Sequence, residues 1–320
     1  MRNRVMVVGA GMMGSGIGAM AALAGHPVTL VDVSEECATA GLKKAVACIR
    51  LREENGLASH EEAKAAVGLL EAGMDIEKEA EKAFMVIEAI VEKLEAKQEL
   101  FKHLDHVLPS EVPICSNTSG LRITEISALC ECHPERAVTT HFWLPAHLVP
   151  LVEVVMGDKT DEAVAVKVRD ELKRWKKSPV LVHRDLPGQL ANRVFQAIIR
   201  EAIDIVASGL ATAEDVDTAI AAGMAMRFPV WGPLKHLDAI GTDLGLSVQE
   251  TVLPSICAER HANEYIREMV AKGDLGAKTG QGFYDWTKRS LEDDMEKRDQ
   301  FIIEACKITS KLNGKGGLKK

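Results

Sequence analysis

Hydrophobic and polar positions alternate in short blocks through the first half of the chain. Residues 4–8 and 27–31 are rich in β-branched side chains, and residues 12–24 between them carry apolar side chains at helical spacing. Two buried strands joined by a helix within roughly thirty residues are typical of a βαβ unit, whose strands are parallel. The pattern therefore predicts that the chain opens with one such unit.

The same alternation continues as far as residue 182. Further strands are predicted at residues 84–87, 114–116, 137–141, 152–155 and 180–182, with helices at residues 94–108 and 162–175. Strands that alternate with helices are typical of a doubly wound, mostly parallel α/β sheet of the Rossmann type. Residues 35–83 are rich in Ala, Glu and Lys, with a turn signal at Asn55-Gly56. They predict a helical hairpin that is inserted into this fold and projects from the sheet.

The pattern changes at Pro187-Gly188. From there to Trp286 the chain reads as helices separated by short Gly and Pro breaks, with few strand-like runs. We therefore predict a Rossmann domain over residues 1–186 and a second, all-α domain over residues 187–320. A length of 320 residues suits two domains, because one domain typically has roughly 100–200 residues.

Composition and charge narrow the class of protein. With 47% hydrophobic and 27% charged residues, the chain has the profile of an ordinary globular protein. A formal net charge of −8 gives no electrostatic reason to bind nucleic acid, and no window reaches the roughly 18 apolar residues that would span a membrane. The seven cysteines are scattered, and Cys130 and Cys132 have no second pair. We therefore expect reduced thiols in a cytoplasmic protein, and no zinc or other metal site.

A glycine-rich motif lies between the first predicted strand and the first predicted helix. Gly9-Ala-Gly11-Met12-Met13-Gly14 fits the pattern G-x-G-x-x-G. In this pattern the first glycine permits a tight turn, the second admits a pyrophosphate and the third lets helix and strand pack closely. Asp32 ends the second strand, where a carboxylate accepts hydrogen bonds from a ribose 2′-OH and repels a 2′-phosphate. The two signals predict a site for NAD rather than NADP; the alternative is that Asp32 only caps the next helix.

The sequence contains ten histidines, and position selects one of them as a candidate for acid–base chemistry. His141 ends one predicted strand and Glu153 lies on the next, and open α/β sheets bind ligands at the ends of their strands. An imidazole can remove a hydroxyl proton while hydride leaves to a dinucleotide, and a carboxylate behind the ring fixes its tautomer. From the pattern alone, a structural role for His141 is the stronger alternative.

Seven motifs in one order resemble the L-3-hydroxyacyl-CoA dehydrogenase superfamily, and they span residues 4 to about 286. They are the glycine motif at residues 9–14, Ile87-Glu-Ala-Ile-Val-Glu92, Ser116-Asn-Thr-Ser119, His141-Phe-Trp-Leu-Pro145, Leu151-Val-Glu153, Pro187-Gly-Gln-Leu-Ala-Asn-Arg193 and Gly273-Asp-Leu-Gly-Ala-Lys-Thr-Gly-Gln-Gly-Phe-Tyr284. Seven motifs together are far more specific than any one of them.

The resemblance implies a role for each matching residue. His141 would be the general base, paired with Glu153, and Ser119 and Asn192 would hydrogen-bond the substrate oxygen. The cofactor-binding set would comprise Gly9, Gly11, Met12, Met13, Gly14, Asp32, Glu92, Lys97 and Asn117, with Glu92 and Lys97 near the nicotinamide and its ribose. The resemblance also implies a homodimer formed through the helical domain.

Three of these roles have simpler alternatives. Ser119 could be the N-cap of a helix over residues 123–129. Asn192 could bond only its neighbours within a helix, and Lys97 could be a solvated charge on a helix surface.

Four departures from the superfamily pattern concern the substrate. Leu144 stands where Asn is usual, Gln189 where Phe is common, and Pro150 where the thioester enzymes tend to carry Met-Lys. Arg227, like Pro150, is more similar to the branch that resembles gulonate and carnitine dehydrogenases. An arginine there could hold a substrate carboxylate through two hydrogen bonds; a structural salt bridge or a solvent-facing position is equally compatible with the sequence.

The resemblance thus implies an NAD-dependent oxidoreductase that converts the 3-hydroxy group of a 3-hydroxyacyl substrate to a keto group. A short-chain 3-hydroxyacyl-CoA, a substrate of fatty acid metabolism, is the first candidate. A small free 3-hydroxy acid held by Arg227 is the second. A non-catalytic, crystallin-like dinucleotide-binding protein is the alternative from another class, and it predicts the loss of at least one catalytic group.

Overall fold

The computed structural model describes residues 3–315. The chain divides into two compact units, one of Met1–Asn192 with Phe301–Lys320 and the other of Arg193–Gln300. The first unit therefore includes residues from both ends of the chain. The division predicted between residues 186 and 187 stays a prediction.

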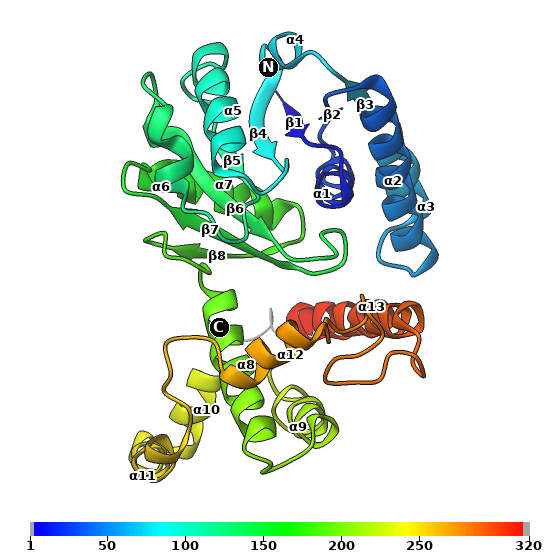
Figure 1. Cartoon of the computed structure of the whole chain (residues 1–320). Coiled ribbons are helices and arrows are strands. Elements are labelled where there is room, and N and C mark those ends of the chain that lie inside the picture. Colours follow the sequence, from blue (N-terminus) through cyan, green and yellow to red (C-terminus); the bar gives the residue numbers. More distant parts are fainter. Residues whose placement is uncertain (1–2, 316–320) are drawn as a thin grey trace. The chain divides into compact units, whose positions relative to one another are not determined.

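The first unit is built on one eight-stranded sheet with the strand order β3-β2-β1-β4-β5-β6-β7-β8 (Figure 1). The strands are β1 Arg4–Val8, β2 Val28–Val31, β3 Leu70–Gly73, β4 Ala83–Glu88, β5 Ile114–Ser116, β6 Ala137–Phe142, β7 Leu151–Met156 and β8 Ser178–Val182. Every neighbouring pair is parallel except β6 and β7. The predicted doubly wound, mostly parallel sheet is confirmed.

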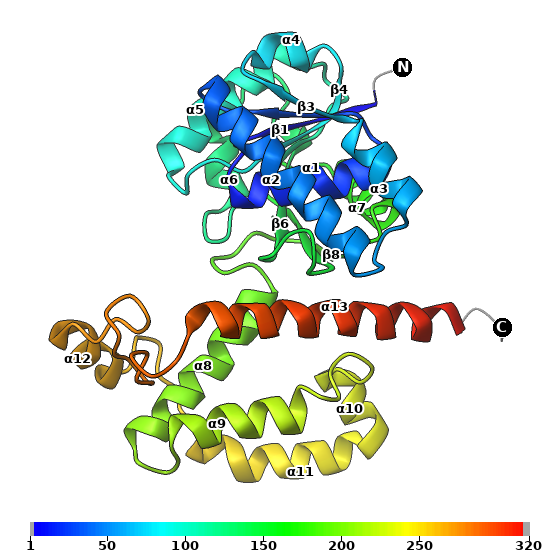
Figure 2. The same cartoon turned by 90° about the vertical axis from the view of Figure 1, so that its right-hand side faces the viewer.

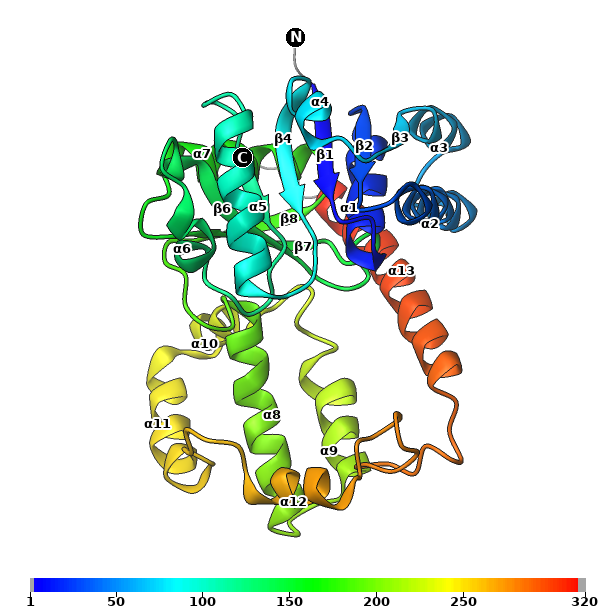
Figure 3. The ribbon, with the colours of Figure 1, turned by 45° about the horizontal axis from the view of Figure 1, so that its top comes forward.

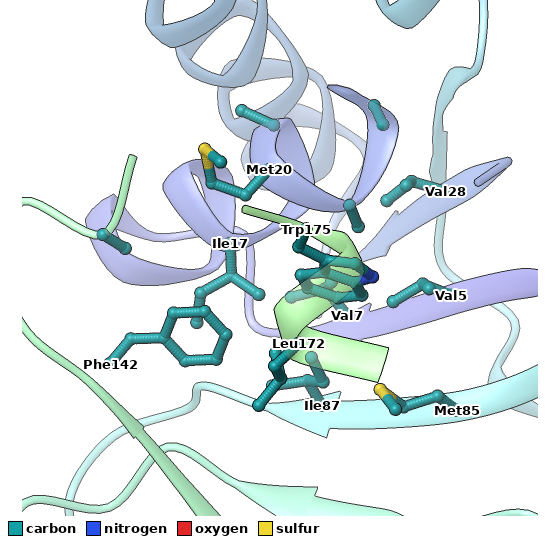
Figure 4. Close-up of a cluster of buried hydrophobic side chains, with 14 of the residues drawn as sticks. Val5, Val7, Ile17, Met20, Val28, Met85, Ile87, Phe142, Leu172 and Trp175 are labelled. Carbon is teal, nitrogen blue, oxygen red and sulfur yellow. The ribbon is translucent and has the colours of Figure 1, made fainter. Parts of the chain in front are cut away.

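Helices cover both faces of this sheet because its central strands are apolar on both sides. Val5 and Val7 of β1 pack into one buried cluster, with α1, α2, α3 and α7, and Met6 packs into the other, with α5 and α6. Figure 4 shows the first cluster, in which Ile17 of α1 lies near Phe142 of β6. The helices of this unit are α1 Met12–Leu23, α2 Glu35–Glu54, α3 His60–Val67, α4 Ile76–Ala80, α5 Leu94–Val107, α6 Ile123–Ile126 and α7 Glu162–Arg174, with 3₁₀ turns at Ser127–Leu129 and Pro134–Arg136.

Residues 35–83 differ from the sequence prediction in two ways. Helices α2 and α3 form, but they pack against α1 through small buried residues such as Ala63 and Ala66 instead of projecting from the sheet (Figure 3). Residues 70–73 form the edge strand β3, which the sequence did not indicate. Only Leu70 of that strand is buried, so it leaves no hydrophobic run to detect.

The second unit is helical, as predicted (Figure 2). Its helices are α8 Ala191–Ala207, which begins at the end of the first unit, α9 Ala213–Ala219, α10 Pro233–Ile240, α11 Thr242–Val252 and α12 Glu264–Lys272, with a π-helical turn at Ile220–Met224 and a 3₁₀ turn at Leu253–Ser255. Helix α13, Leu291–Lys315, begins in this unit and ends in the first. Among residues 3–315, no helix combines the length and apolar character needed to cross a membrane.

Candidate functional site

The glycine motif forms the turn from β1 into α1, and two of its glycines are required by close backbone contacts. Gly9 has a φ of +99°, and a Cβ there would lie 2.5 Å from the carbonyl oxygen of Ala89. A Cβ on Gly14 would lie 1.8 Å from the carbonyl oxygen of Gly9. Gly11 differs, because a Cβ on it would meet no protein atom within 4 Å. The first and third glycines thus serve packing, and the second faces open space that a ligand can occupy.

The N-terminus of α1 is suited to a phosphate group. Gly11 is its N-cap, and no side chain caps the helix there. Met12 is 68% exposed, whereas Met13 packs against the buried cluster behind the loop. A helix N-terminus without a side-chain cap offers N–H groups and a partial positive charge to an anion. These residues therefore fit the pyrophosphate of a dinucleotide.

Asp32 follows β2 and holds the glycine loop. Its Oδ2 accepts a hydrogen bond of 2.7 Å from the N–H of Ala10, and its Oδ1 accepts one of 2.7 Å from the N–H of Val33. The N-cap of α2 is Ser34, whose hydroxyl accepts from the N–H of Cys37. The alternative that Asp32 only caps this helix is therefore wrong. Each carboxylate oxygen keeps a lone pair with which it can accept from a ribose hydroxyl.

His141 and Glu153 are direct partners across the antiparallel pair β6 and β7. His141 Nδ1 lies 2.7 Å from Glu153 Oε2, and His141 Nε2 lies 3.1 Å from Ser119 Oγ. Burial alone would raise the pKa of Glu153, but hydrogen bonds, that from His141 above all, lower it to about 2. An ionised carboxylate only accepts, so Nδ1 carries the proton, and the Nε2 lone pair points toward Ser119.

Glu153 has three further donors that the sequence did not reveal. The N–H groups of Leu190 and Ala191 donate to Oε1 at 2.7 and 2.8 Å. The indole N–H of Trp143 donates to Oε2 at 3.0 Å. Trp143 lies within one of the seven motifs, but nothing in the sequence places its indole beside Glu153. Together with His141, these groups satisfy a carboxylate that is fully buried.

Glu92 fixes the loop that carries Ser119. Its Oε1 accepts from the hydroxyl of Thr118 at 2.6 Å and from the N–H groups of Ser119 and Gly120 at 3.0 and 3.1 Å. Burial works to raise the pKa of Glu92, but these bonds and the charge of Lys97 lower it below its usual value. Ser119 does not cap the following helix, since the N-cap of α6 is Arg122.

Asn117 joins the ends of two neighbouring strands. It follows β5, and its Oδ1 accepts a hydrogen bond of 2.8 Å from the N–H of Phe142 in β6. Its own N–H donates to the carbonyl of Glu88 at the end of β4. Asn117 therefore sets the spacing between the Ser119 loop and His141; contact with a cofactor stays a prediction.

Lys97 is buried in an ion pair and is not the solvated charge of the simpler alternative. Its Nζ lies 2.5 Å from Glu88 Oε1 and 3.2 Å from Glu92 Oε2. Ser116 donates to the other oxygen of Glu88 at 2.6 Å. Glu88 and Ser116 were not predicted as site residues, although both lie within the quoted motifs. The network positions Glu92 from behind.

Two residues that were predicted to bind the substrate take no part in the hydrogen bonds described above. Asn192 is half-buried at the start of α8, and within the described part of the chain it makes no hydrogen bond to His141 or Ser119. Arg227 lies in the second unit, after the π-helical turn, and its side chain is exposed. Their roles stay predictions.

The arrangement suits the removal of a proton from a hydroxyl group beside a dinucleotide. β1, β4, β5 and β6 are parallel neighbours, so the glycine loop, the Ser119 loop and His141 all lie at the same edge of the sheet. When Ser119 Oγ turns its proton from His141 Nε2 to a substrate oxygen, Ser119 donates and Nε2 accepts, so that one substrate hydroxyl can bind to both. In residues 3–315, no cluster of three or more His, Cys, Asp and Glu side chains could hold a metal ion.

Comparison with protein families gives two adjoining matches. Residues 4–186 match the family model for the NAD-binding domain of 3-hydroxyacyl-CoA dehydrogenase, and residues 188–286 match the model for the C-terminal domain. The chain is 39% identical over 289 residues to the probable 3-hydroxybutyryl-CoA dehydrogenase of Bacillus subtilis. The matched residues are 90% of this chain and 99% of that protein.

Two further similarities concern solved structures. That of (S)-3-hydroxybutyryl-CoA dehydrogenase from Ralstonia eutropha has a TM-score of 0.74 and 31% identity, and covers 90% of this chain and all of that one. That of 5-formyl-3-hydroxy-2-methylpyridine 4-carboxylic acid 5-dehydrogenase, described as an NAD⁺-dependent dismutase, has a TM-score of 0.87 and 28% identity. It covers 97% of this chain and 99% of that one. The 5-formyl-3-hydroxy-2-methylpyridine 4-carboxylate 5-dehydrogenase of Mesorhizobium japonicum is 29% identical over 312 residues, which are 96% of this chain and 98% of that protein.

Proposed function

Because the chain belongs to the 3-hydroxyacyl-CoA dehydrogenase family and is an NAD-dependent oxidoreductase, we propose that it oxidises the 3-hydroxy group of a short-chain 3-hydroxyacyl-CoA with His141 as the general base. The observation that carries this proposal is the chain of hydrogen bonds from Glu153 through His141 to Ser119. It lies at the sheet edge that also holds the glycine loop.

Each residue of this chain then has a chemical task. Ser119 and His141 Nε2 bind the substrate hydroxyl, and Nε2 takes its proton. Glu153, which is ionised and buried, stabilises the positive charge that forms on the imidazole. NAD, when bound, would accept the hydride that leaves the carbon atom bearing this hydroxyl group. Gly11 and the first turn of α1 would hold its pyrophosphate, Asp32 its adenosine ribose, and Glu92 would lie near its nicotinamide ribose.

The test replaces the base without changing the fold. His141→Gln keeps a side chain of similar size and removes the titratable nitrogen. We expect the rate of NADH formation to fall by roughly 10³-fold or more, while the affinity for NADH, measured by fluorescence titration, stays within about twofold of the wild type. Turnover close to that of the wild type would contradict the assignment of His141 as the base, whereas a wild type that binds NADH but turns over no substrate would favour a crystallin-like role.

A free acid is the second candidate substrate class, and one comparison favours it. The pyridine carboxylate dehydrogenase matches nearly the whole chain at a higher TM-score than the Ralstonia enzyme. Its substrate, by its name, carries a free carboxylate. Leu144 and Pro150 depart from the usual thioester pattern in the same direction, and Arg227 would be the residue that holds the carboxylate.

Initial rates separate the two classes. We expect NADH formation with 3-hydroxybutyryl-CoA, measured beside free 3-hydroxy acids, including carnitine and gulonate, and a pyridine carboxaldehyde acid. Turnover only with the acids would contradict the thioester assignment. In that case Arg227→Lys should raise KM for the acid more than it lowers kcat, because lysine lacks the paired donors of arginine.

We also propose a homodimer formed through the second unit. Within Arg193–Gln300, Val216 is the only hydrophobic side chain described as buried. The exposed apolar side chains there include Leu210, Met226, Val230, Leu234, Leu244 and Leu246. A helical unit with so little buried apolar surface gains stability by covering it with a second copy. Light scattering after size exclusion should give twice the chain mass; a strict monomer would contradict the proposal.

The cellular location is proposed from the cysteines. All seven are free thiols, two of them exposed, namely Cys37 and Cys132. Such thiols persist in a reducing compartment, which supports the cytoplasm as the site of action. Fractionation of cells that express the tagged protein tests this assignment.

A further inference from the structure

Trp143 and His141 donate to the same oxygen of the same carboxylate. Trp143 Nε1 lies 3.0 Å and His141 Nδ1 lies 2.7 Å from Glu153 Oε2. The two rings are tilted by 51°, with their centroids 5.9 Å apart. Trp143 is half-buried and follows directly after β6, the strand that carries His141, so the base and this second donor lie two residues apart in the chain.

The two donors differ in one respect that matters for a base. The imidazole becomes a cation when it takes a proton, whereas the indole N–H keeps its proton over the whole working range of pH. A carboxylate oxygen that already accepts from a neutral donor has less negative charge left to stabilise the imidazolium. The Trp143 hydrogen bond therefore weakens the hold of Glu153 on a proton bound to His141.

Few other charges surround the pair. Glu153 on β7 faces His141 directly, and the start of α8 contributes only the backbone amides of Leu190 and Ala191. Behind the Ser119 loop lie the carboxylates of Glu92 and Glu88, which share the positive charge of Lys97. Within residues 3–312, no other charged group forms a hydrogen bond or an ion pair with His141 or Glu153, so the strength of the base depends mainly on the donors shared at Glu153.

The same three residue types meet a second time in this chain, away from the glycine loop. Trp175 Nε1 lies 3.0 Å and His26 Nε2 lies 2.8 Å from Glu171 Oε1, and Glu171 is buried. His26 precedes β2, at the opposite end of that strand from Asp32. The second triad places an indole and an imidazole on one carboxylate oxygen away from the glycine loop, and it therefore provides a matched control.

We propose that Trp143 is a positioning residue for the oxidation: by sharing Glu153 Oε2 with His141, it sets the lower pH limit at which the base works. This inference rests on the proposed function of His141. Without the indole N–H, Glu153 holds the imidazolium more firmly. The base then becomes neutral, and therefore active, only at a higher pH.

The test removes the N–H and keeps the ring. In Trp143→Phe, and in a chain in which 3-benzothienylalanine replaces Trp143 with nearly the same volume, we expect the acid limb of kcat/KM for oxidation to move up. The shift should be about 0.5 to 1 pH unit, because the loss of one hydrogen bond to a charged group changes the balance by that order. The plateau rate at high pH should fall less than about tenfold.

The control and the contrary outcomes are distinct. Trp175→Phe removes the equivalent bond at Glu171 and should lower thermal stability while leaving the acid limb in place. An unmoved acid limb in both Trp143 variants, a shift to lower pH, or an equal shift in Trp175→Phe would overturn the inference. His141→Gln distinguishes a failure of this inference from a failure of the proposed function. If His141→Gln keeps its activity, the assignment of the base is wrong. If His141→Gln is inactive and the acid limb does not move in the Trp143 variants, only the role of Trp143 is overturned.

Discussion

Two alanine variants test the different roles of the glycines in the loop. Gly14→Ala tests whether Gly14 is needed for packing, and Gly11→Ala tests whether Gly11 leaves room for a ligand. In Gly14→Ala the new methyl group would lie 1.8 Å from the carbonyl oxygen of Gly9 and 3.3 Å from a methyl group of Val7. In Gly11→Ala it would meet no protein atom within 4 Å, and the backbone there, with φ −69° and ψ −165°, is allowed for alanine.

The cost of Gly14→Ala follows from how firmly the Gly9 carbonyl is held. To reach ordinary van der Waals contact, that oxygen must move by roughly 1.5 Å. The peptide group that precedes this carbonyl is fixed between two strands, because the N–H of Gly9 donates to the carbonyl of Val31 and the carbonyl of Val8 accepts from the N–H of Ala89. Overpacking of this kind costs about 3 kcal/mol or more in the free energy of unfolding. In a unit of this size that lowers the melting temperature by roughly 6–12 °C.

Two measurements on both variants decide the matter. Thermal unfolding followed by circular dichroism should show the loss in Gly14→Ala and a change within about 1 kcal/mol in Gly11→Ala. Titration with NADH should show at least a tenfold loss of affinity in Gly11→Ala, since its methyl group takes the place that the pyrophosphate would occupy. A stable Gly14→Ala, or a Gly11→Ala that binds NADH like the wild type, would refute the division of roles.

Two further predictions concern charges. Asp32→Asn keeps an acceptor for the N–H of Ala10 but removes the negative charge, so the preference for NAD over NADP should fall by about 10- to 100-fold in kcat/KM; an unchanged ratio would mean that this carboxylate does not read the ribose. Burial, with a smaller effect from Arg52, lowers the pKa of Lys177 from 10.5 to about 7, although its Nζ donates to the carbonyls of Ala146 and Val149. Below pH 7 Lys177 is protonated in both the folded and the unfolded chain, and its buried charge destabilises the folded state in full. Between pH 7 and 10.5 only the unfolded chain keeps this proton, so the stability of the folded state rises with pH. The wild type should therefore gain stability relative to Lys177→Met, by about 5 kcal/mol across that window in denaturant unfolding; parallel pH curves would contradict the shift.

The fold could be predicted from the sequence wherever a strand is buried on both faces. Residues 5–8 of β1 are all apolar and pack into two different clusters, so the composition of this run marks it as a central strand. The edge strand Leu70–Gly73 has the sequence Leu-Glu-Ala-Gly and pairs with β2 through its backbone. Backbone pairing leaves no pattern of side chains, so this strand could not be predicted.

The site was predictable to the extent that side chains carry it. Asp32 and the glycines follow from the spacing of one motif, and His141 with Glu153 follows from the resemblance to a family. Glu88 and Trp143 could not be predicted as partners, because their contacts depend on which strands become neighbours in the sheet.

The segment that joins the two units shows why part of the site has no sequence signal at all. Gly188 and Gln189 both have a positive φ, of 82° and 52°. This conformation is costly for Gln189, which is buried, and it is followed at once by two N–H groups that donate to Glu153 Oε1. A chain that bends in this way brings backbone donors to the carboxylate behind the base, and almost any residue could supply them. One oxygen of Glu153 thus accepts from backbone N–H groups at the start of α8, and the other accepts from the side chains of His141 and Trp143 at the end of β6. The residues with which the chain leaves the sheet for the helical unit therefore also hold the carboxylate behind the base.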